Sequence, residues 1–207
     1  MNKEKQLAFN TIAYFFGSLG KGISTILIIF IGSYYISPDS MGIYDLVIST
    51  ITLFQPIIIF QINDAIYRWL LDPEYDNDKI ISIGVKIAVR NLIITNIIFI
   101  VISFFITINY SWIVLVLLNI NCIYPIFQQI TRGLKNHSVF AKSGIINAIL
   151  IVALTIFFVC ILNLDILGLY LAQLLANLCS VIYMYINQRK IIKFTGHKKY
   201  EHNLGRS

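Results

Sequence analysis

Six long apolar segments with short polar connections constrain this chain more than any other feature. They cover residues 10–36, 41–71, 80–108, 112–132, 139–162 and 166–187. Each is long enough for an α-helix to cross the hydrocarbon core of a bilayer, which takes about 20 residues. None alternates as a barrel strand would, and open sheets cannot span lipid. The sequence therefore predicts an all-α, polytopic membrane protein. Six transmembrane helices lie within residues 1–190, and a basic tail covers residues 191–207.

The composition supports a membrane rather than a soluble or nucleic-acid-binding protein. Charged residues make up 13% of the chain, about half the share usual in soluble domains. The net charge of +6 would indicate a nucleic-acid partner only if the basic residues formed a patch on a soluble face. They are instead scattered at the ends of apolar segments, so we expect membrane lipids and no nucleic acid as partners. Cys122, Cys160 and Cys179 lie within apolar segments without metal-ligand spacing, which predicts buried, inert thiols.

The basic residues predict an orientation in the membrane. The three short turns at 37–41, 109–111 and 163–165 contain no Lys or Arg, whereas the other connections or their flanks and both termini all contain Lys or Arg. By the positive-inside rule, both termini are expected in the cytoplasm and the three short turns outside the cell. The first apolar segment is too long for a cleavable signal, so it is expected to be retained as an anchor in the plasma membrane.

The turn between the first two segments has a distinctive sequence. Pro38 cannot continue the preceding helix, and it pushes Ser37 out of the α region. Asp39 and Ser40 can each accept hydrogen bonds from the first N–H groups of the following helix. Either residue is therefore expected to cap that helix.

Two stretches of this region resemble a known family. Tyr34-Tyr35-Ile36-Ser37-Pro38 is followed by Gly42-Ile43-Tyr44-Asp45-Leu46, and the same segment ends in Ile62-Asn63-Asp64-Ala65-Ile66-Tyr67-Arg68-Trp69-Leu70-Leu71-Asp72. Together they resemble the N-terminal lobe of the polysaccharide and O-antigen flippases. These are lipid-linked oligosaccharide exporters of the multidrug/oligosaccharidyl-lipid/polysaccharide superfamily.

The resemblance implies a fold and a function. It implies two six-helix lobes around a central cavity, of which this chain matches the N-terminal one, and alternating access by rocking of the lobes. The implied function is flipping of lipid-linked oligosaccharide or polysaccharide repeat units across the membrane. A proton or sodium gradient would drive it, without a cofactor. We expect a truncated N-terminal half whose C-terminal lobe is missing. The alternatives are a half-transporter that pairs with a second copy and a lobe completed by another chain.

Ionisable and amide side chains within the predicted spans are the candidate substrate-binding residues. They are Lys21, Arg90, Gln128 and Asn177. A charge at membrane depth usually faces protein or water, and a cationic cavity would attract an anionic lipid pyrophosphate. Lys21 could instead snorkel to the membrane surface. Gln128 and Asn177 lie on polar stripes of the fourth and sixth spans, which could serve only as hydrogen bonds between helices.

The second span carries the candidates for an ion or gating site. Pro56 removes one backbone hydrogen bond, which predicts a kink or hinge. Asp64 and Arg68 are four residues apart and can pair along the helix. Asp45 lies on the same polar stripe as Pro56. The alternative is an ordinary packed helix whose Asp64–Arg68 pair lies at the cytoplasmic interface. The fifth span is nearly all apolar and is expected to face lipid or pack passively.

No pattern typical of an enzyme is present. We find no phosphate-binding loop, HExxH motif or nucleophile elbow, and the three histidines share no spacing. A membrane glycosyltransferase could use only the acidic loop at 72–78, which is equally typical of a solvated connector. The chain is therefore expected to be a transporter. A non-transporting subunit of a polysaccharide assembly complex and a multidrug exporter are the alternatives.

Overall fold

All regular secondary structure in the described part of the chain is helical. The computed structural model describes residues 22–105 and 110–204, with side chains as far as Gln188, and no strand occurs within these ranges. A helical segment, Gly22–Tyr35, precedes α2 (Pro38–Ile58), α3 (Ile62–Leu70), α4 (Asn77–Phe105), α5 (Ser111–Gly133), α6 (His137–Thr155), the π-helix η1 (Ile156–Ile161) and α7 (Asp165–Leu204). The all-α prediction is therefore confirmed for these residues.

Five helical stretches of the described residues are long and apolar enough to cross a membrane. They are α2, α4, α5, the continuous α6–η1 stretch and α7 as far as Gln188. They correspond to the second to sixth predicted spans, and Gly22–Tyr35 belongs to the first. The beginning of the first predicted span lies outside the described residues, so the count of six stays a prediction. The architecture is that of a helical, multi-pass membrane protein.

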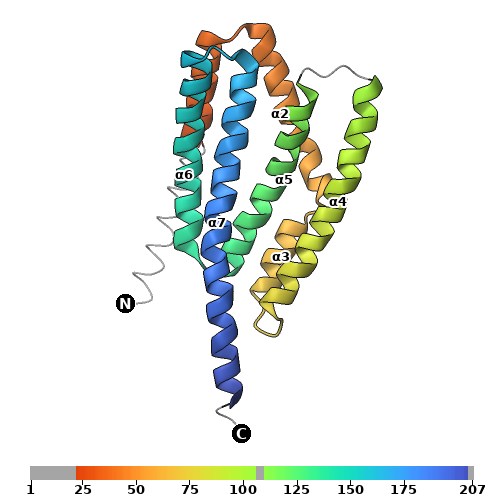
Figure 1. The fold of residues 1–207 in the computed structure, drawn as a ribbon, viewed down its shortest axis with the longest axis vertical. Coiled ribbons are helices and arrows are strands. Elements are labelled where there is room, and N and C mark those ends of the chain that lie inside the picture. The colour runs from red at the N-terminus through yellow and green to blue at the C-terminus, as the bar shows by residue number, and fades with distance from the viewer. Residues whose placement is uncertain (1–21, 106–109, 205–207) are drawn as a thin grey trace.

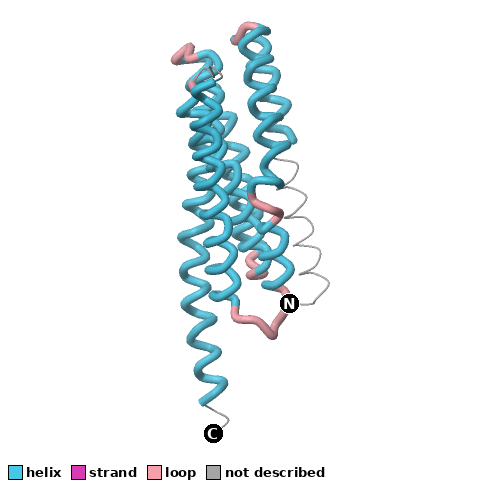
Figure 2. Tube along the Cα trace, turned by 90° about the vertical axis from the view of Figure 1, so that its right-hand side faces the viewer, coloured by secondary structure: helices cyan, strands magenta, loops and turns pink. Residues whose placement is uncertain are grey.

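The helices form an elongated bundle with connections at two ends (Figures 1 and 2). The turns at Ser37 and Asn163 lie at one end, which we call the short-turn end. The loops at 71–76 and 134–136 and the C-terminus of α7 lie at the other, the basic end (Figure 1). The two short turns meet, because the Ser40 hydroxyl donates to Asp165 Oδ2 at 3.0 Å. This arrangement agrees with the predicted alternation of turns, while the side of the membrane that each end faces stays a prediction.

Exposed aromatic residues lie near both ends. Trp112 is exposed near the start of α5, at the short-turn end, and Trp69 and Tyr75 are exposed at the basic end. The rings of Trp69 and Tyr75 meet edge to face, 4.8 Å apart. Trp and Tyr favour the two interfaces of a bilayer. From Trp112 to Arg132, α5 rises by about 30 Å at ~1.5 Å per residue, which matches the hydrocarbon thickness of a membrane.

The start of α2 differs from the prediction. The helix begins at Pro38, and Ser37 is its N-cap, with an extended backbone and a side chain that accepts from the Ser40 N–H at 3.3 Å. The expectation that Asp39 or Ser40 caps this helix is therefore wrong. Proline suits the first position of a helix, because its fixed φ is already helical and its missing N–H would have no partner there.

The second predicted span, 41–71, is not one continuous helix. α2 ends at Ile58 and α3 begins at Ile62, because Phe60 and Gln61 have left-handed backbones, with φ of 49° and 53°. The Gln61 N–H donates to the Pro56 carbonyl at 3.2 Å, outside the regular helical pattern. The predicted disturbance at Pro56 is thus present as a break that begins a few residues later. Apolar residues continue across it, so the pattern alone did not indicate where the helix stops.

The fifth and sixth spans also differ from simple helices. α6 passes into the π-helix η1, in which Leu162 N–H donates to the Phe157 carbonyl at 3.1 Å. α7 continues past residue 187, where the sixth span was expected to end, as far as Leu204. It extends beyond the other helices at the basic end (Figure 1).

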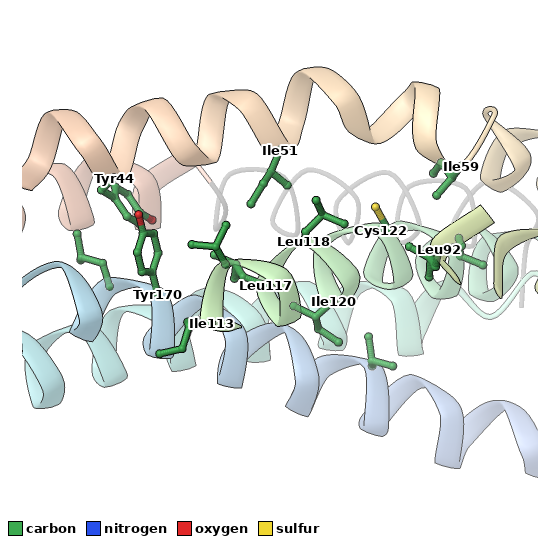
Figure 3. Close-up of a cluster of buried hydrophobic side chains, with 14 of the residues drawn as sticks. Tyr44, Ile51, Ile59, Leu92, Ile113, Leu117, Leu118, Ile120, Cys122 and Tyr170 are labelled. Carbon is green, nitrogen blue, oxygen red and sulfur yellow. The ribbon is translucent and has the colours of Figure 1, made fainter. Parts of the chain in front are cut away.

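α5 and α7 form the centre of the bundle. α5 packs against α2, α3, α4, α6 and α7, and its Leu117 and Cys122 are fully buried. Figure 3 shows these side chains beneath α2, with Tyr44 and Tyr170 facing one another. The expectation of three buried cysteines is correct only for Cys122. Cys160 is half-buried and Cys179 is exposed on α7, because a membrane protein can leave apolar side chains at its surface, where lipid covers them.

Candidate functional site: polar side chains within the bundle and on its surface

A cluster of neutral polar side chains joins four helices inside the bundle. Gln173 and Asn177 lie one turn apart on α7, and both donate to Asn121 Oδ1 of α5, at 3.3 and 3.2 Å. Asn147 of α6 donates to Asn177 Oδ1 at 2.9 Å, and the Tyr44 hydroxyl of α2 donates to Gln173 Oε1 at 3.2 Å. We call these five residues the amide cluster. Their groups satisfy one another, which favours a structural role between helices.

Two further groups of hydrogen bonds fasten neighbouring helices. Asn96 of α4 and Asn119 of α5 exchange amide hydrogen bonds of 3.2 and 2.8 Å. Near the basic end, the buried Gln188 of α7 donates to the Thr131 hydroxyl and to the Phe127 carbonyl of α5. Neutral amides and hydroxyls thus supply these hydrogen bonds between the helices of the bundle.

Two predicted substrate-binding residues belong to this interior. Asn177 is 6% exposed and lies in the amide cluster. Gln128 is half-buried and donates to the Tyr124 hydroxyl of its own helix at 2.9 Å. Each side chain therefore already has a protein partner.

Arg90 lies on a different surface. It is exposed on α4, which packs against α2, α3 and α5, whereas Asn177 lies among α5, α6 and α7. Arg90 donates to Oδ1 of the buried Asn91 at 3.4 Å. An open depression of about 400 Å³ lies beside it, lined by Val85, Lys86, Val89, Arg90, Ile93 and Ile94. Two cations above aliphatic side chains can accept an anionic headgroup together with an apolar chain.

The polar stripe of α2 is also on the surface. Asp45, Ser49, Thr52 and Pro56 are all exposed. The Thr52 hydroxyl only donates back to the Ile48 carbonyl of its own helix, at 2.8 Å. Asp45 lies about 10 Å along α2 from its start, at ~1.5 Å per residue. α2 and α4 therefore both expose charged or hydroxyl groups at the surface of the bundle.

Asp64 and Arg68 do not form the predicted pair along α3. Both side chains are exposed, and no ion pair joins them in the described structure. Asp64 Oδ1 instead accepts from Gln129 of α5 at 2.8 Å and from Asn63 at 3.3 Å. The local spacing permitted the pair, but a partner from the neighbouring helix takes the carboxylate.

Gln129 connects Asp64 to a second charge. Its Oε1 accepts from Arg132 Nη1 at 3.2 Å. The Arg132 guanidinium lies over the rings of Tyr67 and Phe140, 4.9 and 5.6 Å from their centroids. These contacts join α3, α5 and α6 near the basic end.

Lys21, the fourth predicted substrate-binding residue, lies outside the described residues. Ser24, three residues further along the chain, is 6% exposed and donates to the Ala148 carbonyl of α6 at 3.1 Å. The cavity role of Lys21 stays a prediction.

Sequence reasoning missed several members of the polar groups. Asn147 is the single amide within the apolar part of α6, and that isolation was the signal that it needs a partner. Tyr44 was noted only as part of a motif, yet it is 8% exposed and reaches α7. The expectation that the fifth span packs passively is therefore wrong for Asn147.

The fold and these groups define the class of the protein, a helical multi-pass membrane protein with an amide-linked interior and charged residues on α2 and α4. Comparison of the chain with protein-family models, curated proteins and solved structures finds no match.

Proposed function

We propose that this chain is one lobe of an exporter that flips lipid-linked oligosaccharide or polysaccharide repeat units across the plasma membrane. The proposal rests on where the two kinds of polar side chain lie, neutral amides in the interior and charged groups at the surface. Neutral amides are used inside the lobe, while Asp45 and Arg90 are exposed on α2 and α4. Charged side chains at membrane depth are costly against lipid and are found facing water or protein. The α2–α4 surface therefore suits one wall of a hydrophilic path.

Three further features favour this substrate class. The depression beside Lys86 and Arg90 combines cations with aliphatic side chains, which suits a phosphate group attached to a long lipid. The two sequence stretches around Pro38 and Tyr67 resemble those of the oligosaccharide flippases. A cationic wall also disfavours the cationic compounds that many multidrug exporters carry.

The second wall of the path comes from another lobe, either a C-terminal lobe or a second copy of this chain. Lys21 and Arg90 contact the substrate phosphate or sugar, and Asp45, Asp64, Arg68 and Pro56 belong to the coupling or gating apparatus. A proton or sodium gradient supplies the driving force. Neither a cofactor nor an enzymatic step is required.

Export complementation tests the proposal. A cell that lacks its own flippase would receive this chain together with a matching C-terminal lobe, and surface polysaccharide would be measured. We expect Arg90→Gln to abolish export while protein abundance stays unchanged. Lys79→Gln is the matched control, because Lys79 is exposed at the start of the same helix.

If the chain alone restores export in the cell and also purifies as a dimer, the protein is a homodimeric half-transporter. Full export with Arg90→Gln would remove Arg90 from the substrate path. Absence of export with every lobe combination, despite normal abundance, would favour a non-transporting subunit of an assembly complex.

A further inference from the structure

The break between α2 and α3 is a strained part of the backbone. Phe60 and Gln61 are consecutive non-glycine residues in the left-handed region, where the Cβ atom crowds the backbone. Gln61 makes no side-chain capping bond to α3. Pro56, four residues before Phe60, has no N–H to complete the preceding turn. Residues on both sides must hold this conformation in place.

α3 is held firmly below the break. A methyl group at Gly84 of α4 would overlap Ile66, and one at Gly133 of α5 would lie 2.7 Å from Leu70 Cβ. Both glycines therefore let α3 approach its neighbours closely. Ile66 and Leu70 are 2% and 6% exposed. The Gln129–Asp64 hydrogen bond adds a polar contact on α5.

The first half of α2 is also held. Its Tyr44 and Ser40 donate hydrogen bonds to Gln173 and Asp165 of α7, and Ile51 is 5% exposed. Between Ile51 and the fully buried Ile59, however, no side chain is buried, and only Gln55 and Ile58 are half-buried. The middle of the predicted second span thus lacks the packing that fixes both of its ends.

We propose that residues 52–58 form a hinge at which α2 bends against the left-handed break at Phe60 and Gln61, while α3 stays fixed on α4 and α5. Hinges absorb backbone changes at a few positions that end a secondary-structure element, and here a proline, two left-handed residues and an unburied stretch coincide. The inference deepens the gating role that the proposed function gives to Pro56, but its test is separate, because bending can be measured without transport.

Spin-label distances in the full chain, reconstituted in lipid nanodiscs, test the hinge. One pair joins Phe54→Cys on α2 to Ile83→Cys on α4, and the reference pair joins Trp69→Cys on α3 to Ile83→Cys. All three label sites, Phe54, Ile83 and Trp69, are exposed, and the three native cysteines are replaced by alanine. We expect a broad or two-peaked distribution for the first pair and a single narrow one for the reference. Equally narrow distributions for both pairs would overturn the proposal.

A glycine substitution tests the backbone conformation separately. Gln61→Gly should widen the distribution of the first pair without lowering the midpoint of thermal unfolding, because glycine adopts positive φ freely. Thr50→Gly, within regular α2, should lower that midpoint and leave the reference pair narrow. If Gln61→Gly lowers the midpoint as much as Thr50→Gly does, position 61 is ordinary helix and the hinge is excluded.

Discussion

Asn121 illustrates how a single amide stabilises a helical bundle. Its Oδ1 accepts from two α7 side chains, and its Nδ2 donates to the Leu117 carbonyl of its own helix at 2.9 Å. Hydrogen bonds between membrane helices contribute about 0.6–2 kcal/mol each, because the unfolded chain also finds partners. Asn121 therefore fixes the position of α5 relative to Gln173 and Asn177 of α7, although each hydrogen bond adds little to the free energy of unfolding.

Replacing Asn121 by alanine should destabilise the protein. The change removes the acceptor of two interhelix hydrogen bonds, so we expect the free energy of unfolding to fall by about 1–3 kcal/mol. Asn187→Ala is the matched control, because the Asn187 amide bonds only the Tyr183 carbonyl of its own helix. Reversible unfolding in detergent micelles would measure both variants. Equal losses would mean that the amide cluster adds nothing specific.

At the scale of the elements, α3 is distinct from the long helices. It has nine residues and a strongly one-sided distribution of apolar side chains, with Ile66 and Leu70 inside and Asp64, Arg68 and Trp69 outside. Such a helix is too short to cross a membrane by itself. It depends on close contact with α4 and α5, which Gly84 and Gly133 make possible.

Gly133→Ala should weaken that contact. The added methyl group would lie 2.7 Å from Leu70 Cβ and Cδ1, and overpacking of this kind costs about 1–3 kcal/mol. Gly42→Ala in α2 meets nothing within 4 Å and should instead stabilise by about 0.4–1 kcal/mol. Unfolding midpoints of the two variants should therefore move in opposite directions. A shared direction would contradict the close approach of α3 to α5.

The whole molecule combines an apolar interior, in which neutral amides hydrogen-bond between helices, with charged side chains at the surface, Asp45 and Arg90 among them. The two ends also differ. Arg132, Lys135 and Lys142 lie at or beside the basic end, which also carries the acidic loop at 72–78, whereas the described turns of the short-turn end contain no Lys or Arg. This asymmetry is the physical basis for an orientation in the membrane.

Reporter fusions would test that orientation. Fusions ending at Asp39 and Asn163 should report the outside of the cell, and fusions ending at Asn77 and Asn136 should report the cytoplasm. The reason is that basic flanking residues are retained on the cytoplasmic side during insertion. A cytoplasmic signal at Asp39 or Asn163 would refute the six-span arrangement.

The sequence by itself determined the class of fold. Runs of apolar residues must become helices in a lipid interior, because every backbone N–H and C=O needs an internal partner there. The same reasoning placed the turns near Ser37, Tyr110 and Asn163. Polar stripes on the spans were also visible, because side chains three or four residues apart share a helix face.

The tertiary structure decided which stripes are inside and which are outside. Periodicity gives the relative direction of Asn177 and Gln173, but not the neighbour that they face, so the interior amide cluster and the exposed Arg90 looked alike in sequence. The tertiary structure also decided the partner of Asp64, since Gln129 lies 65 residues further along the chain, on α5. The break at Phe60 and Gln61 depended on the neighbours as well. Left-handed backbone is unfavourable locally, and it is held by the burial of Ile59 and by the packing of α3 against Gly84 and Gly133.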